Sequence, residues 1–324
     1  MASALFQDEP ATPQRIGAGS FASIYVIRGG LLAFKIVHVP AHANILRLEF
    51  EALQKIHRLC NSDSFFCLPK PMSYYDPRDD TLLHTPAPPE SRQSRRCGSV
   101  KRPQLVGVGV FRALSQLDPV YAMHRVPALP DQASRSICAR YIPRTFVAVP
   151  GLRLCRLYFG KIYTDEVPRF VNTNNFPLDV GRFNMLRHDN EDLELPSAEE
   201  VALEMGDMLA RIHWRGGFDA RDVEFVMGGD GMTSSVSFYV IDFNQMRKWG
   251  KAIEDIPILV DAFFQNDPYY PRPREQDPIY SAFKEGYRSC YPRADDCQMI
   301  ADAFLAAIEG QQSMRDQRLV DAEV

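Results

Sequence analysis

Three carboxylates lie close together in the stretch Gly216–Val226, which reads GGFDARDVEFV. Asp219, Asp222 and Glu224 fall within six residues, at the entrance of an apolar segment with the composition of a strand. A carboxylate pair binds a guanidinium through bidentate, charge-assisted hydrogen bonds. A carboxyl group of raised pKa also acts as a general base, for example toward an α-amine that attacks an ester. We therefore predict that these residues bind a cationic substrate group and transfer protons.

A structural role is the alternative for the same three acids. Asp219 would then be a turn residue, and the other two carboxylates would pair with arginines nearby in the sequence. The candidates for that pairing are Arg211, Arg215 and Arg221.

The elements that must position these acids follow from the apolar pattern. Three short apolar runs within residues 15–37, broken by glycine turns, predict a three-stranded antiparallel meander. Residues 41–60 predict a helix whose apolar stripe contains Ile45, Leu48, Ala52, Ile56 and Leu59.

Further along the chain, strand-like runs occur at residues 105–111 and 152–159. A helix is predicted at about 197–214, because Ser197 and Glu200 form a capping-box pattern before an apolar face. The apolar run SVSFYVIDFNQ then predicts a strand that ends at Asp242.

This order of features resembles the protein-kinase and aminoglycoside-phosphotransferase fold. In that fold a glycine turn and a lysine bind phosphates, a glutamate pairs with the lysine, and an aspartate binds a metal ion. The corresponding positions here are the glycine turn, Lys35 in LAFKIV, Glu49 on the next helix and Asp242. The resemblance implies an α+β, two-lobe kinase-like fold. A small sheet-rich lobe would cover residues 1–125 and a larger, mainly helical lobe residues 126–324, with Lys35, Glu49 and Asp242 lining the substrate site.

The catalytic loop departs from that pattern. Phosphoryl transfer in this fold needs an aspartate five residues before an asparagine. If Asp222 stands at the asparagine, Gly217 occupies the position of the base. A glycine cannot accept a proton, so we expect a different chemistry on this fold.

The segments IHWRGGFDARDVEFV, FYVIDFNQ and NDPYYPRP are similar to signatures of a fungal family of unknown-function domains labelled zinc-finger-like. The similarity covers most of the chain. The family includes the arginine-containing cyclodipeptide synthases of secondary metabolism. These enzymes join arginine from arginyl-tRNA to an amino acid from a second aminoacyl-tRNA and close a 2,5-diketopiperazine without ATP.

The resemblance implies the same reaction here, with no cofactor and no metal. Asp219, Asp222 and Glu224 would bind the guanidinium and handle protons. Two alternatives are a small-molecule or protein kinase with a rearranged catalytic loop, and a pseudokinase-like binding module without chemistry.

Aminoacyl-tRNA as a partner requires a basic surface. Residues 75–104 are rich in Pro, Ser and Arg without any period, which predicts an exposed insertion. Its basic residues would contact phosphates, unless they form only a solvated charge run. Arg272 and Arg274, interleaved with Tyr269 and Tyr270, form a second candidate in which the rings would stack on a base. The basic residues of the insertion are Arg92, Arg95, Arg96, Lys101 and Arg102.

Composition is that of a soluble protein, with a net charge of −4 that does not favour nucleic acid overall. No apolar run is long enough for a bilayer and the first ten residues lack the features of a signal peptide, so we expect a cytoplasmic protein with no membrane partner and no obligate protein partner.

His57, Cys60 and Cys67 are close in sequence, but no second ligand pair has matching spacing, and we predict no metal site.

Overall fold

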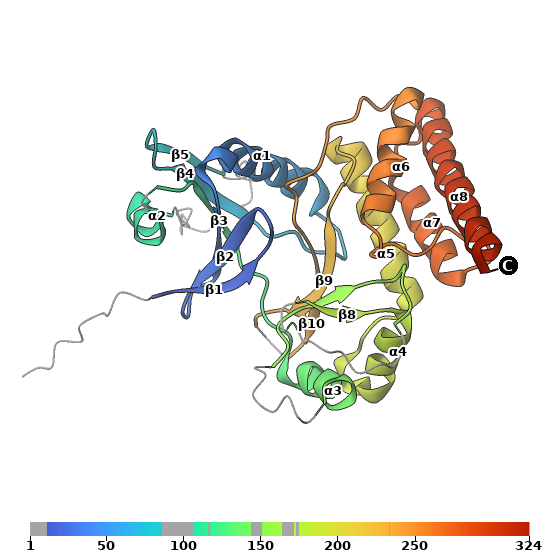
Figure 1. Ribbon diagram of the computed structural model, residues 1–324, viewed down its shortest axis with the longest axis horizontal. Coiled ribbons are helices and arrows are strands. Elements are labelled where there is room, and N and C mark those ends of the chain that lie inside the picture. Colours follow the sequence, from blue (N-terminus) through green and yellow to red (C-terminus); the bar gives the residue numbers. More distant parts are fainter. Residues whose placement is uncertain are drawn as a thin grey trace, which may run out of the picture. The chain divides into compact units, whose positions relative to one another are not determined.

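The computed structural model describes residues 12–85, 106–115, 117–143, 151–163, 172, 175–232 and 234–323 (Figure 1). The chain divides into two compact units. The first unit comprises Met1–Gln54 and Lys70–Arg125, and the second comprises Lys55–Pro69 and Val126–Val324. Both strands and helices occur, so the protein is α+β with mostly antiparallel pairing. None of the helices in the described part of the chain is long and apolar enough to span a membrane.

The first unit is built on a six-stranded sheet in the order β1-β2-β3-β6-β4-β5, with every neighbouring pair antiparallel. The predicted three-stranded meander is confirmed as its first three strands. The strands are β1 (Pro13–Ala18), β2 (Ala22–Ile27), β3 (Leu32–Val37), β4 (Pro71–Asp76), β5 (Thr81–His84) and β6 (Val120–His124).

The segment predicted as a strand at 105–111 is instead the start of a helix, α2 (Val108–Leu114). Its Phe111 is fully buried, lies edge-on to Phe34 and stacks on Tyr75, with ring centroids 6.2 and 5.7 Å apart. A short apolar run has no period that separates strand from helix, which explains the wrong prediction.

The predicted insertion at 75–104 also begins too early. Residues 75–76 end β4, and Thr81–His84 forms β5, which pairs with β4. Residues 86–105 lie outside the described part of the chain, and with them all five basic residues proposed there for tRNA.

A short 3-10 turn (η1, Pro40–His42) leads into the helix α1 (Ala43–Cys60), which the sequence predicted. The predicted stripe is confirmed at Ala52 and Ile56, which are buried, and wrong in the first half of the helix, where Ile45 and Leu48 are 40% and 55% exposed. Leu46, Phe50 and Leu53 are fully buried instead, at the i, i+4 and i+7 spacing of one helix face.

The second unit contains a four-stranded sheet in the order β10-β9-β7-β8. The hairpin β9/β10 is antiparallel, β7 pairs antiparallel with β9, and β8 is parallel to β7. The strands are β7 (Cys155–Leu157), β8 (Phe176–Leu178), β9 (Glu224–Gly229) and β10 (Val236–Ile241).

Helices make up most of the remainder of the second unit (Figure 1). The predicted capping box of α5 is confirmed, since Ser197 Oγ accepts from the Glu200 N–H and the Glu200 carboxylate accepts from the Ser197 N–H. Gly206 of α5 and Gly286 of α7 let these helices pack closely, because a Cβ at either position would collide with a backbone oxygen of the other helix. The helices are α3 (Asp131–Tyr141), α4 (Val180–Asp189), η4 (Glu191–Leu193), α5 (Ala198–Ala210), the π-helical η5 (Arg211–Gly216), η6 (Ile253–Asp255), α6 (Ile256–Gln265), α7 (Pro278–Cys290) and α8 (Asp295–Glu323).

Candidate functional site

Three carboxylates lie at one end of the β9/β10 hairpin. Glu224 opens β9 and pairs in register with Ile241, the last residue of β10, so Asp242 leaves the hairpin at the end where Asp222 enters it. Asp222 and Asp242 both have left-handed backbones, with φ of 65° and 64°. Such conformations cost non-glycine residues about 1 kcal/mol or more and cluster at functional sites. We therefore take this end of the hairpin as the candidate site.

Glu224 is held by an arginine that the sequence analysis did not consider. Its carboxylate forms an ion pair with Arg156 of β7. Arg156 pairs in register with Val226, so its side chain lies on the same sheet face as that of Glu224, two residues away. Arg156 Nη1 also donates to Tyr269 Oη at 2.6 Å.

The ionisation of Glu224 is shifted by its surroundings. Burial raises the pKa of its carboxyl group to about 7; Arg156 opposes this shift, and Asp242 and Asp222 add to it. A carboxyl group of that pKa exchanges protons efficiently near neutral pH. Glu224 thus has the properties of a general base.

Asp222 is fixed through the NDPYYPRP motif. The N–H of Asp222 donates to Asn266 Oδ1 at 2.5 Å, and Asn266 Nδ2 donates to the Ala220 carbonyl at 2.7 Å. The carboxylate of Asp222 accepts from Gln245 Nε2 at 2.6 Å. Asn266 is buried and sets the conformation of the acidic loop.

Asp219 has an enclosed environment. Its side chain is fully buried and accepts from Arg247 Nε at 2.5 Å, from the Arg247 N–H at 2.8 Å and from the Arg221 N–H at 3.1 Å. These contacts support the structural alternative for this residue. The guanidinium groups of the three arginines considered there bond elsewhere: Arg211 to Asp207, Arg215 to Cys290 Sγ and Arg221 to Asp261.

Lys35 and Glu49 form an ion pair within the first unit. Lys35 Nζ lies 2.6 Å from Glu49 Oε1, which also accepts from Tyr121 Oη at 3.1 Å. Both charged side chains are buried. The other predicted acids belong to the second unit: Asp219, Asp222, Glu224 and Asp242.

Arg272 and Arg274 already have carboxylate partners. Arg272 donates to Asp267 at 2.7 Å, and Arg274 forms two bonds to Asp316 at 2.7 and 2.8 Å. Tyr269 and Tyr270 are only 7% and 4% exposed, so both rings are covered by other residues of the protein.

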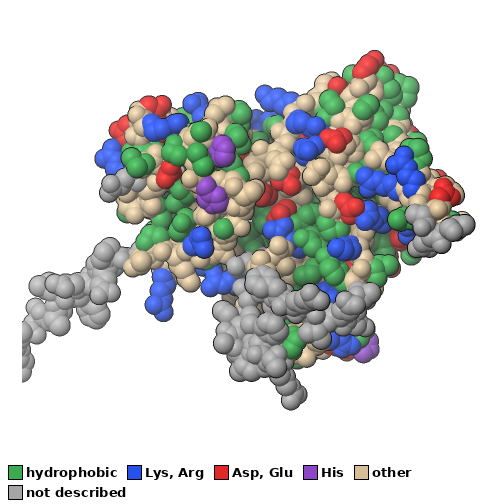
Figure 2. Space-filling model, viewed as in Figure 1, with side chains coloured by type: hydrophobic (Ala, Val, Ile, Leu, Met, Phe, Trp, Pro, Cys, Tyr) green, Lys and Arg blue, Asp and Glu red, His purple; other side chains and the backbone are tan. Residues whose placement is uncertain are grey.

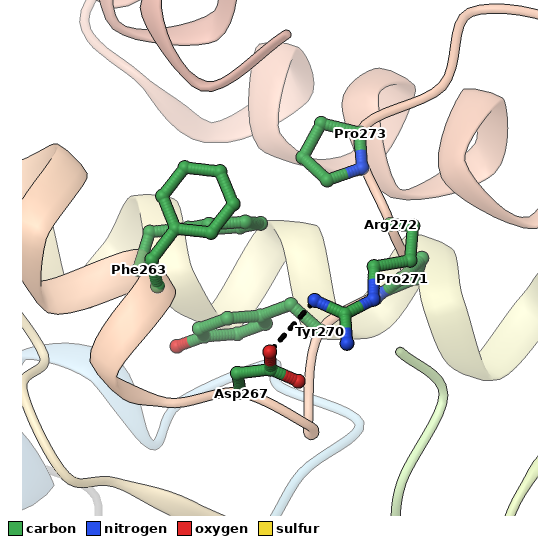
Figure 3. Close-up of a pocket in the computed structure, with 7 residues that line it drawn as sticks. Phe263, Asp267, Tyr270, Pro271, Arg272 and Pro273 are labelled. Carbon is green, nitrogen blue, oxygen red and sulfur yellow. Dashed lines mark hydrogen bonds and ion pairs between the residues drawn. The ribbon is translucent and has the colours of Figure 1, made fainter. Parts of the chain in front are cut away.

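Figure 3 shows the pocket beside this segment. Arg272 points toward Asp267 across the pocket, so the two charged residues that line the pocket neutralise each other. Tyr270 contributes a ring that is stacked on Phe263, with centroids 4.8 Å apart. The other lining residues are Phe264, Pro271 and Pro273.

The face shown in Figure 2 carries Lys and Arg side chains interspersed with Asp and Glu rather than gathered in one patch. Within the described ranges, no three His, Cys, Asp or Glu residues are grouped so as to hold a metal ion. Cys60 Sγ lies 3.3 Å from the Arg211 carbonyl oxygen, to which it donates.

Comparison with protein-family models finds a match to part of the chain. The family model DUF3669, described as zinc finger protein, matches residues 238–298. No curated protein matches the chain. The matched segment has two cysteines and no histidine, fewer than the four ligands of a structural zinc site. It includes Asp242, Asn266 and Tyr269, so the chain resembles DUF3669 over part of its candidate site.

Proposed function

We propose that the protein is a tRNA-dependent cyclodipeptide synthase on a kinase-like fold, which joins arginine from arginyl-tRNA to an amino acid from a second aminoacyl-tRNA. The observation that supports this proposal best is Glu224, a largely shielded carboxyl group of pKa about 7 beside two further acids. The motif resemblance supplies the substrate class, and the match to DUF3669 lies over two of the three motifs.

The proposed chemistry needs only a base and a cation site. The α-amine of an aminoacyl ester is an ammonium ion, which the acidic cluster attracts. Glu224 accepts a proton from it, and the free amine attacks the carbonyl carbon of the other ester. An amide forms and the ester C–O bond breaks; the second proton of the nitrogen passes to the released tRNA oxygen, and Glu224 gives its proton to solvent before the next attack. A second attack of this kind closes the six-membered ring.

Asp222 and Asp242 would bind the arginine guanidinium, since two carboxylates match its planar fork. Asp219 would act through the loop that it orders, by its bonds to Arg247 and Arg221. The ester is already activated by the tRNA, so no nucleotide is consumed. The proposed reaction does not use the kinase base, so a glycine at its position, Gly217, is compatible with this reaction.

A kinase with a rearranged loop is the second candidate, favoured by the buried Lys35–Glu49 pair. Such a pair orients the phosphates of ATP in protein kinases. The two candidates differ in their need for ATP, which gives the test.

The test uses purified protein, precharged arginyl-tRNA and a pool of other aminoacyl-tRNAs, with mass spectrometry of the products. Arginine-containing diketopiperazines should form without ATP and disappear in Glu224→Gln. No such product with any pool, together with thermal stabilisation by Mg²⁺-ATP, would support the kinase instead.

A further inference from the structure

Three segments that are far apart in the sequence meet at Glu224. Arg156 comes from β7, Glu224 from the start of β9 and Tyr269 from the segment after α6. Arg156 is the link, because its Nη1 donates both to the Glu224 carboxylate and to Tyr269 Oη. Its side chain is 22% exposed and that of Glu224 is 15% exposed, so the pair is largely shielded from water.

Several charges of the second unit act on Glu224, and they act in opposite directions. Asp222 on the preceding loop and Asp242 after β10 disfavour its ionised form, as does burial, whereas Arg156 favours it. Arg156 itself remains protonated: burial acts to lower the pKa of its guanidinium, but Tyr269 and Glu224 outweigh burial and raise it. Arg156 therefore offsets the unfavourable effect that burial, Asp222 and Asp242 have on the ionised form of Glu224.

Tyr269 is held more rigidly than its position in a proline-rich segment suggests. Its N–H donates to the Asn266 carbonyl at 2.8 Å, and its own carbonyl accepts from the Phe159 N–H at 3.2 Å. Its ring packs edge-on against Tyr158, with centroids 5.0 Å apart. Burial, followed by the charge of Glu224, raises the pKa of its phenol, so the hydroxyl stays neutral.

We infer that Arg156 and Tyr269 are positioning residues for Glu224: Arg156 holds its carboxylate in place through their ion pair, and Tyr269 fixes the guanidinium of Arg156. The catalytic part of this inference rests on the proposed function. Neither residue touches substrate in this assignment, and both act on the reaction through Glu224.

Substitutions separate this role from simple structural support. Arg156→Gln removes the cation, so Glu224 should become harder to ionise. An opposite charge in direct contact typically moves a carboxyl pKa by about 1 to 3 units, which sets the size of the expected change. Tyr269→Phe keeps the ring and removes only the hydroxyl, so its effect should have the same direction and be smaller. Loss of structural support alone would lower stability without moving the titration.

The test is a carbon-13 NMR titration of the full chain with glutamate labelled at the side-chain carboxyl carbon. The Glu224 signal is assigned by its absence in Glu224→Gln. We expect a midpoint near pH 7 in the wild type and a midpoint at least about 1 unit higher in Arg156→Gln. Arg288→Gln, which removes a guanidinium paired with Asp302 elsewhere in the second unit, should leave the midpoint unchanged.

An unchanged Glu224 midpoint in folded Arg156→Gln would overturn the inference. If that variant does not fold, Tyr269→Phe gives the test, and an unchanged midpoint in it would overturn the inference equally; Arg156→Lys, which keeps the cation, is the matched control and should keep a midpoint close to that of the wild type. The titration needs no tRNA, so its outcome is independent of the proposed function. A shifted titration without diketopiperazine product would uphold the role of Arg156 and reject the synthase.

Discussion

Asn266 fixes the backbone of Asp222. Its side-chain oxygen accepts the Asp222 N–H at 2.5 Å while its nitrogen donates to the Ala220 carbonyl at 2.7 Å. Ala220 and Asp222 both have positive φ, of 56° and 65°, so the loop needs an external partner to keep its shape. One buried amide thereby couples NDPYYPRP to the acidic loop.

Asn266→Ala should therefore destabilise the protein and disorder the acidic loop. It leaves two buried backbone groups without a bond, which costs roughly 1 to 3 kcal/mol each. Urea denaturation gives the change in the free energy of unfolding. Asn184→Ala removes an exposed asparagine from α4 and should change it by less than about 0.5 kcal/mol. Equal stability of the two variants would contradict the role of Asn266.

Replacing the acids themselves should abolish product with little loss of stability. Asp222→Asn and Glu224→Gln remove negative charge at nearly constant volume. Loss of one such contact is worth about 2 to 4 kcal/mol of transition-state binding, or roughly thirty-fold to a thousand-fold in rate. Single-turnover rates with precharged tRNA measure the effect, and Glu285→Gln, at an exposed position on α7, is the control. Near wild-type rates in both variants, with normal melting, would rule out the acidic site.

Much of this framework could be predicted from the sequence, because it depends on local patterns. The β1–β3 meander, the cap of α5 and the strand that precedes Asp242 each have a signal within a few residues. The ion-pair partner of Glu224 has no such local signal. The sequence suggests arginines close to Glu224 in the chain, whereas the actual partner, Arg156, lies 68 residues away on a three-residue strand. Contacts of that kind are set by sheet register, which no local pattern encodes.

Lys35→Met should separate the kinase from the synthase. A kinase would lose ATP binding and activity together, because this lysine orients the phosphates. The synthase should show no dependence on ATP before or after the change. Removing Lys35 also leaves Glu49 buried, and breaking a buried pair costs about 3 to 5 kcal/mol, so folding must be measured in parallel. Lys35→Met/Glu49→Leu, which leaves no buried charge of the pair, is the matched control. A strict ATP requirement with precharged tRNA would overturn the synthase assignment.

Stability should fall in acid partly because of His213. Burial lowers the pKa of its imidazole to about 3, in a cluster of rings from Trp249, Tyr287 and Phe304. Above pH 6.5 the ring is neutral in both states. Between pH 6.5 and about 3 only the unfolded chain protonates this ring, so the contribution of His213 to the free energy of unfolding falls by up to about 1.4 kcal/mol per pH unit. Glu224, whose pKa is raised to about 7, contributes with the opposite sign below that pH, so the effect of His213 is the difference in slope between wild type and variant.

His213→Asn should lower stability at neutral pH and flatten this decline. Asn retains a polar atom that can bond to Tyr287 Oη, the partner of His213 Nδ1 at 2.9 Å. Urea denaturation at several pH values between 4 and 7 measures the slope. His188→Asn changes a histidine whose side chain is 83% exposed and should keep the wild-type slope. A slope in His213→Asn as steep as in the wild type would contradict this assignment, because the paired carboxylates Asp76 and Asp316, whose pKa values are lowered by their arginine partners, lose their contribution mainly below about pH 5.

The salt dependence of tRNA binding tests the two candidate basic surfaces against each other. Each phosphate contact contributes about −0.9 on duplex and −0.7 on single strands to the slope of log K against log salt. Changing the five basic residues of the insertion to glutamine should remove about three contacts and lower the magnitude of that slope by roughly 2 to 3. Those residues are Arg92, Arg95, Arg96, Lys101 and Arg102.

Arg272→Gln/Arg274→Gln provides the comparison. Both guanidinium groups are already paired, with Asp267 and Asp316, so a phosphate would have to displace a carboxylate at each position. We therefore expect this double variant to change the slope of log K against log salt by less than the contribution of one phosphate contact, about 0.7 to 0.9. Filter binding of arginyl-tRNA from low to moderate salt measures both variants. If the fivefold variant gives a line that coincides with the wild type while the double variant does not, tRNA is bound by the segment after α6, and the insertion carries only solvated charge.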